Sequence, residues 1–291
     1  MMQIECVVKS GDQVGEVPVW CDRSNLLWWM DVRRPRVQSF DPVTREHKVY
    51  LTGGRALGSY ALRESGGMLL AQDDGIYAFT PGAGDREKIF DPEEDLPDNR
   101  LNDGRCDRRG RFWLGSMNDK VRQDDGNFWR IGSDLSAQKF FDGINIPNGV
   151  CFSPDDKTMY FADTPKRMMW AFDFDIDAGV ISNRRVFADL TANPGRPDGS
   201  TVDAEGFVWN CEFAGKRVVR YAPNGKVDRI IEMPVTNITC AGFAGPNRDI
   251  LYVTTAWQGL SDEQRAAEPD AGGLFRIDVG VKGLPEPRFQ G

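Results

Sequence analysis

Residues 146–149 read Ile-Pro-Asn-Gly, and residues 196–199 repeat the pattern as Arg-Pro-Asp-Gly. In each tetrapeptide the proline fixes one backbone angle and the glycine frees another, which is typical of a tight turn with one short polar side chain in its middle. An apolar strand, a polar turn and an aromatic second strand follow both turns. Asn148 and Asp198 therefore occupy matching places in two repeats, and we expect their oxygen atoms to point toward a common metal ion.

The same unit recurs along the chain, and a bulky residue marks its second strand each time. Successive markers are separated by 42, 43, 47, 49 and 43 residues. Six units of about four strands each match the period of a β-propeller, roughly 40 to 50 residues. A pair of β-sandwich domains would not explain this spacing without a linker. The sequence predicts an all-β, six-bladed β-propeller with four-stranded blades, one domain over residues 1–291 and a metal site in its central channel. The markers are Trp28, Leu70, Trp113, Tyr160, Trp209 and Tyr252.

Two segments lie outside the regular repeat. Residues 258–272 are the most divergent, and their polar stretch 261–267 predicts a short helix or loop inserted in the last blade. The two ends, residues 3–8 and 288–289, are expected to pair and close the ring, which would leave no open sheet edge.

Composition excludes several classes of function. The 36 basic and 44 acidic side chains give a net charge of −8, which argues against nucleic acid or an anionic membrane as a partner. The single histidine, His47, removes histidine-rich zinc sites and Ser-His-Asp triads, and we expect it to be an inert surface residue. The six cysteines form no Cys-x-x-Cys pair, which favours free thiols in a reducing compartment.

The beginning of the chain has neither a basic segment nor an apolar segment of a secretory signal, and no apolar run is long enough to cross a bilayer. We therefore expect a cytoplasmic protein, a monomer or weak homodimer, whose partner is a small molecule.

Counting back from the markers aligns the residues that open the innermost strands. Glu16 lies 12 residues before Trp28, Asn148 lies 12 before Tyr160, and Asp198 lies 11 before Trp209. The innermost strands of a propeller line its channel, so equivalent strand ends converge on the axis. We expect these three side chains, with Asn102 or Asp103, to ring one end of the channel.

Several motifs carry a resemblance over nearly the whole chain. They are Gly-Glu-Val-Pro-Val-Trp at 15–20, Arg-Leu-Asn-Asp-Gly at 100–104, Gly-Arg-Phe-Trp-Leu-Gly-Ser-Met at 110–117, Ile-Pro-Asn-Gly at 146–149, Tyr-Phe-Ala-Asp-Thr at 160–164 and Arg-Pro-Asp-Gly at 196–199. In this order and register the chain resembles the gluconolactonase/regucalcin (senescence-marker-protein) family of six-bladed propellers. The resemblance implies a sugar lactonase in which Glu16, Asn148 and Asp198 hold a divalent metal and Asp198 is the acid/base.

The resemblance also implies that Arg100 and Asn102 contact the sugar lactone. The chain departs from the pattern at two places. Lys120 stands where some animal members have an acidic substrate contact, which makes it a candidate substrate-binding residue, and Val17 replaces the usual glycine after Glu16.

Glutamate, asparagine and aspartate supply oxygen donors, the set that hard cations prefer. Ca²⁺ is the first candidate, with Zn²⁺, Mg²⁺ and Mn²⁺ as alternatives. Three protein ligands leave positions for water and substrate, as catalytic sites do. In this hypothesis the metal polarises the lactone carbonyl while a carboxylate takes the proton of the attacking water.

Each site residue also has a purely structural interpretation. Asn148 and Asp198 could bond their own turn backbones, and Glu16 could be a solvated acid at a strand end. Arg100 could be a surface charge beside Asp98, Lys120 a solvated loop lysine, and Asp103 a turn residue. At the level of function, the alternatives are a non-catalytic calcium- or sugar-binding propeller and a related ester or organophosphate hydrolase. The last is weakened where it would rely on a channel histidine.

Overall fold

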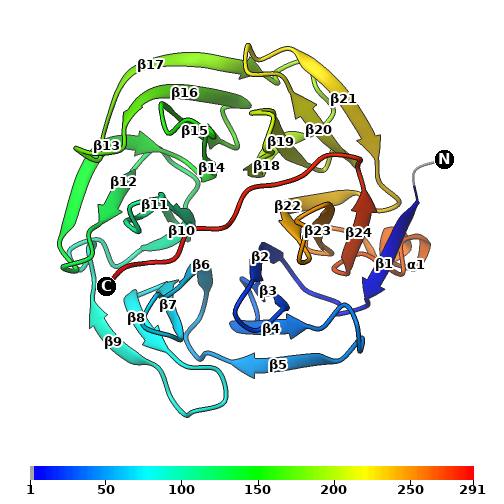
Figure 1. Ribbon diagram of the computed structural model, residues 1–291, viewed down its shortest axis with the longest axis horizontal. Coiled ribbons are helices and arrows are strands. Elements are labelled where there is room, and N and C mark those ends of the chain that lie inside the picture. The colour runs from blue at the N-terminus through cyan, green and yellow to red at the C-terminus, as the bar shows by residue number, and fades with distance from the viewer. Residues whose placement is uncertain (1–2) are drawn as a thin grey trace.

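The computed structural model describes residues 3–291 as six four-stranded antiparallel sheets arranged around a central channel (Figure 1). The predicted six-bladed β-propeller is confirmed. Blades 1 to 5 each use four consecutive strands, with the first one innermost. The innermost strands are β2 (Gly15–Cys21), β6 (Leu57–Leu62), β10 (Asn99–Cys106), β14 (Pro147–Phe152), β18 (Arg196–Val202) and β22 (Asn237–Ala244).

The second strands carry the six bulky markers, and the third and fourth strands lie progressively further from the axis. Second strands are β3 (Leu26–Asp31), β7 (Met68–Gln72), β11 (Phe112–Asn118), β15 (Thr158–Asp163), β19 (Val208–Phe213) and β23 (Ile250–Ala256). Third strands are β4 (Arg36–Phe40), β8 (Gly75–Phe79), β12 (Gly126–Ile131), β16 (Met168–Asp175), β20 (Arg217–Tyr221) and β24 (Leu274–Asp278). Outer strands are β5 (His47–Leu51), β9 (Glu87–Phe90), β13 (Ala137–Ile144), β17 (Val180–Asp189), β21 (Val227–Glu232) and, in blade 6, β1 (Ile4–Val8).

Six apolar clusters hold the blades together, one at each junction between neighbouring blades. Between blades 1 and 2, for example, Met30 and Val37 pack with Tyr60 and Leu70, all of them buried. The markers Trp113 and Trp209 are fully buried at the blade 3–4 and blade 5–6 junctions. Apolar burial at these junctions supplies the main driving force for closing the ring.

The two ends of the chain close the ring differently from our prediction. β1 pairs with β24, so the N-terminal strand completes blade 6. Residues 288–289 do not pair with it. The C-terminal segment crosses the centre of the ring instead (Figure 1), where the Phe289 amide donates to the Leu62 carbonyl at 2.8 Å and the Gln290 amide donates to the Gly110 carbonyl at 3.0 Å. Buried Phe289 thus anchors a segment that covers the end of the channel at which the innermost strands finish.

The inserted segment in the last blade contains a short helix, α1 (Asp262–Ala267), which is the first of the two predicted alternatives, helix or loop. Among residues 3–291, no helix combines the length and apolar character that a bilayer crossing needs. All six cysteines are free, and only Cys6 is not fully buried. His47 is half-buried rather than exposed: it stacks on Trp29, with 5.2 Å between ring centroids, and its Nε2 lies 3.0 Å from Gln38 Oε1.

Candidate functional site

A cavity of about 240 Å³ opens at the end of the channel where the innermost strands begin. Glu16 on β2, Asn148 on β14 and Asp198 on β18 line it, and so do Asn102 and Asp103 on β10. The structure therefore brings together five side chains that lie up to 182 positions apart in the sequence. All five are buried.

Each innermost strand is irregular at the site. The pairing with the second strand shifts register immediately after Glu16, Asn148 and Pro197, and between Leu101 and Gly104. Such bulges turn side chains away from the regular alternation of a sheet. They explain why the first residues of these strands face the channel. At Val17 the turn requires a positive φ of 53°, which is unusual for a β-branched residue.

The turn before β14 is held by a buried acid that recurs in other blades. Asp163, at the end of β15, accepts the backbone amides of Asn145 and Ile146, each at 3.0 Å. Asp31 and Asp73 accept the equivalent pairs of amides in blades 1 and 2. These aspartates fix the chain just before the site residues, so Asp163 acts as scaffolding.

Hydrogen bonds set the orientation of the Asn148 amide. Its Nδ2 donates to Thr164 Oγ1 at 2.7 Å, and the Thr164 hydroxyl donates in turn to the Pro197 carbonyl at 2.7 Å. With the nitrogen engaged, the oxygen Oδ1 is the atom left for the cavity, where it is 3.3 Å from Asn102 Nδ2. Thr164 was not predicted from the sequence to have this role.

Three carboxylates share the cavity without a basic partner. Burial raises the pKa of Glu16 well above its ordinary range, and the charges of Asp198 and Asp103 raise it further. Burial and the Asp103 charge likewise raise the pKa of Asp198. No lysine or arginine of residues 3–291 forms an ion pair with any of the three; Arg105, whose charge acts on Asp103, pairs with Glu286 at 3.3 Å.

These residues fit a divalent cation by the chemistry of their donor set. Unpaired buried carboxylates are costly, and a bound cation removes that cost. Among residues 3–291, no three His, Cys, Asp or Glu side chains are arranged to hold a metal by themselves. An ion here would therefore need the amide oxygen of Asn148 beside the carboxylates of Glu16 and Asp198.

Arg100 is buried and forms part of a network, so it is not a surface charge beside Asp98. Its Nε donates to Asp119 Oδ1 at 2.9 Å and its Nη1 donates to Asn102 Oδ1 at 2.6 Å. Arg33, from the turn after β3, donates twice to the same Asp119, at 2.7 and 2.6 Å. Asn102 uses its own nitrogen on the Pro147 carbonyl at 2.7 Å, and so joins Arg100 to the Asn148 turn.

Lys120 is not brought to this cavity. Its side chain is 66% exposed and its ammonium pairs with Asp98 on the surface. Its neighbours in sequence are the ones that reach the site: Asp119 through Arg100, and Arg122 as part of the cavity lining. Arg33, Asp119 and Arg122 were not singled out by the sequence, because arginines and aspartates in surface turns have no distinguishing pattern; Arg196 was quoted only as part of the 196–199 motif and was given no role.

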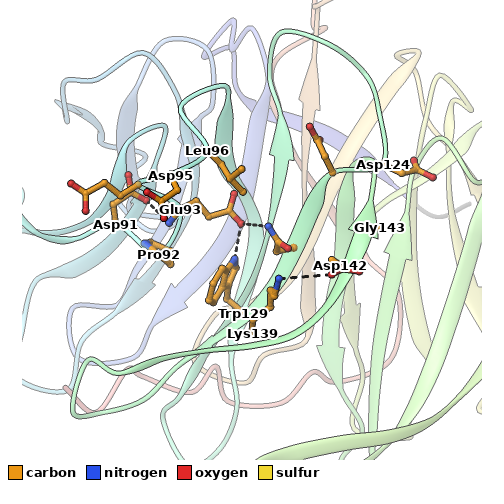
Figure 2. A pocket seen from close by; sticks show the side chains of 13 residues that line it. Asp91, Pro92, Glu93, Asp95, Leu96, Asp124, Trp129, Lys139, Asp142 and Gly143 are labelled. Atoms are coloured by element: carbon orange, nitrogen blue, oxygen red, sulfur yellow. Dashed lines mark hydrogen bonds and ion pairs between the residues drawn. The ribbon is translucent and has the colours of Figure 1, made fainter.

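A larger cavity of about 620 Å³ lies away from the channel, among the β9–β10 connection, β12 and β13 (Figure 2). Its most buried acid, Glu93, accepts hydrogen bonds from Asn127 Nδ2 at 2.8 Å and Trp129 Nε1 at 2.7 Å, and from Asn99 Nδ2 at 2.7 Å. A carboxylate that is satisfied in this way holds loops together. The functional site is therefore placed in the smaller cavity, where the carboxylates lack partners.

The fold and the cavity define the class of protein, a six-bladed β-propeller in which buried carboxylates, asparagine amides and Arg100 gather at one end of the channel. The family model described as SMP-30/gluconolactonase/LRE-like region matches residues 14–257, so the chain belongs to this family.

Relatives and solved structures of similar length agree with that assignment. The chain is 35% identical to regucalcin of Xenopus laevis, covering 100% of this chain and 99% of the relative. It is 33% identical to a 6-deoxy-6-sulfogluconolactonase of Pseudomonas putida, with 99% of each covered. The crystal structure of a calcium-binding protein, regucalcin, from Agrobacterium tumefaciens superimposes with a TM-score of 0.94 at 30% identity, covering 99% of this chain and 98% of the other.

Proposed function

We propose that this protein is a sugar lactonase that opens an aldonolactone to the free sugar acid by hydrolysis, using a divalent cation held by Glu16, Asn148 and Asp198. The observation that carries the proposal is that buried, unpaired carboxylates line the same cavity as Arg100 and Asn102. A relative named as a sulfogluconolactonase supports the reaction, and a solved relative described as calcium-binding supports Ca²⁺ as the first candidate.

A bound divalent cation would supply Lewis-acid polarisation of the lactone carbonyl and charge compensation for the oxygen that becomes negative. The protein supplies the position of the substrate. Arg100 has two of its three nitrogens engaged, so its Nη2, which has no partner among residues 3–291, is free to donate to a sugar hydroxyl. The Asp119 carboxylate and the Asn102 amide hold the guanidinium in place.

Proton transfer falls to a carboxylate of the cavity. Asp198 accepts a proton from the attacking water as the C–O bond to the water oxygen forms, and returns a proton to the ring oxygen as the ring C–O bond breaks. Burial raises the pKa of the Asp198 carboxylate in the metal-free protein, whereas a bound cation would lower it again. Asp103 lines the same cavity and accepts the Val150 amide at 3.1 Å, so it is the second candidate for the base.

A pH-stat assay tests the proposal directly. Acid release is followed with gluconolactone, galactonolactone, xylonolactone and arabinonolactone, after removal of metal with a chelator and after return of Ca²⁺, Zn²⁺, Mg²⁺ or Mn²⁺. We expect activity to disappear on removal and to return with a divalent ion. Full activity of Glu16→Gln or Asp198→Asn would rule the mechanism out.

One observation favours a second function, a non-catalytic calcium-binding propeller. The solved structure reported above is that of a regucalcin described as a calcium-binding protein. An ion with a purely structural role does not require a substrate-binding arginine beside it. Arg100→Ala therefore distinguishes a lactonase from a non-catalytic calcium-binding propeller. It should abolish lactone turnover and leave cation binding intact if the protein is a lactonase.

A further inference from the structure

The cavity has a second set of charged residues that the lactonase mechanism does not use. Besides Arg100, three arginines line it: Arg33 from blade 1, Arg122 from the β11–β12 loop of blade 3, and Arg196 at the start of β18 in blade 5. Four guanidinium groups from three blades thus surround one mouth, in a protein whose net charge is −8.

Only one carboxylate neutralises the three arginines of blades 1 and 3. Arg33 and Arg100 both donate hydrogen bonds to Asp119. The charges of Asp119 and Arg33 also act on the pKa of Arg122, which burial lowers. Burial and the neighbouring Arg33 charge lower the pKa of Arg100 to about 10. Three guanidinium groups around one carboxylate leave two uncompensated positive charges. These charges repel one another, and a bound anion would reduce the repulsion.

Arg122 and Arg196 have guanidinium N–H donors that are free to bind a ligand. Arg122 Nη1 makes only long contacts, 3.7 Å to Met117 Sδ and 3.4 Å to the Asn118 carbonyl. Within residues 3–291, the Arg196 side chain makes no hydrogen bond or ion pair; its backbone pairs with Phe213. Both residues are exposed at the mouth. Arginine forks match the planar oxygens of carboxylates and the oxygens of sulfonates and phosphates.

The cavity is therefore polarised. Carboxylates occupy the channel end and attract a cation, whereas guanidiniums occupy the mouth and attract an anion. A lactone bound with its carbonyl toward Glu16 and Asp198 would extend its far end toward Arg122 and Arg196. A neutral sugar lactone would leave these two arginines without a partner.

We propose that the substrate of this site is an anionic lactone, one that carries a carboxylate, sulfonate or phosphate group at the end remote from the lactone carbonyl, and that Arg122 and Arg196 are the residues that select it. This inference rests on the proposed lactonase function and specifies its substrate class. Arg33 is a positioning residue, because it acts through Asp119 on Arg100.

The test compares kcat/KM for neutral glucono-1,5-lactone with that for 6-phosphoglucono-1,5-lactone and glucaro-1,4-lactone, which carry a phosphate and a carboxylate. We expect the better anionic lactone to exceed the neutral one by about tenfold or more at low ionic strength, and the ratio to shrink as salt screens the arginines. Arg122→Ala and Arg196→Ala should each lower the ratio by about tenfold, the loss of one ion pair of this kind. Arg109→Ala, an exposed arginine paired with Asp177 at the opposite end of blade 3, is the control and should leave the ratio unchanged.

Binding of the open acids separates this inference from the lactonase proposal. Calorimetry with 6-phosphogluconate and gluconate should show tighter binding of the phosphorylated acid, lost in Arg122→Ala and Arg196→Ala, even if no lactone is hydrolysed. Absence of any lactone turnover would overturn the lactonase proposal alone. Equal binding of the two acids, or a preference that both variants retain, would overturn the inference about the arginines.

Discussion

Buried acids in two regions of this propeller differ in one respect, the presence of an arginine. In the body of the blades, buried Asp107 lies 2.6 Å from Arg111, Asp203 lies 2.7 Å from Arg220, and Glu212 lies 2.9 Å from Arg217. At the channel mouth, equally buried Glu16 and Asp198 have no such partner among residues 3–291. The first group consists of acids that the protein itself neutralises, and the second of acids that, in our proposal, bind a cation.

The largest expected effect comes from removing a channel acid. Asp198→Asn and Glu16→Gln should each lower kcat/KM for lactone opening by about a hundred- to a thousandfold, since losses of this size follow removal of one group that stabilises charge in the transition state. The same changes should raise the thermal stability of the metal-free protein by a few degrees, because they remove a buried uncompensated charge. Asp189→Asn, at an exposed position, is the control for both measurements.

For a buried acid in the body of a blade, we expect a loss of stability and no loss of activity when its arginine partner is removed. Arg220→Ala leaves buried Asp203 with only the Trp209 Nε1 hydrogen bond at 2.9 Å as a side-chain partner. Breaking a buried pair typically costs about 3–5 kcal/mol, which we expect as a clear loss in the free energy of unfolding. Activity per folded molecule should be retained, as measured by denaturation and by assay of the surviving native protein.

The six-bladed fold could be predicted because a period of 42 to 49 residues and a bulky second-strand marker are visible in one sequence. Asn148 and Asp198 could be predicted because they stand in matched turns of that period. The network around Arg100 could not, because Arg33 and Asp119 come from turns whose sequences do not repeat. Nor could the route of residues 288–289, because β1 closes the ring by pairing with β24 and leaves the C-terminal segment free to cross the channel.

The unpaired channel acids also predict that the stability of the metal-free protein depends on pH. The pKa of Glu16 and that of Asp198 are raised in the folded, metal-free protein, so the folded state retains these protons at a pH where the unfolded state has lost them. Their contribution to stability is therefore present below the ordinary pKa values of 4.5 and 3.8 and declines as pH rises above them. Thermal melts of the metal-free protein from pH 5 to 8 should show this decline. In Glu16→Gln/Asp198→Asn it should be much smaller, and an unchanged decline would contradict the assignment.

A smaller effect is expected at Thr164. Thr164→Val removes the hydroxyl that accepts from Asn148 Nδ2 and leaves the shape of the side chain almost unchanged. Loss of a residue that orients a ligand typically weakens metal binding by about 10- to 100-fold. Titration with Ca²⁺ should show a weaker affinity in that range, whereas Thr164→Ser, which keeps the hydroxyl, should bind like the parent.

The smallest effect is expected at Val17. Relief of its positive φ in Val17→Gly is worth about 1–2 kcal/mol, and loss of its buried side chain costs about 1.5–3 kcal/mol. Burial outweighs strain, so we expect a net destabilisation of about 1 kcal/mol in chemical denaturation. A gain in stability would mean that the strained backbone beside Glu16 dominates.

Calorimetric titration of the metal-free protein with Ca²⁺ tests the central claim most directly. The account predicts one ion bound per chain, and loss of that binding in both Glu16→Gln and Asp198→Asn while the folded propeller persists by circular dichroism. Undiminished binding in these variants would contradict it, because the unpaired acids of the channel would then serve some purpose other than holding a cation.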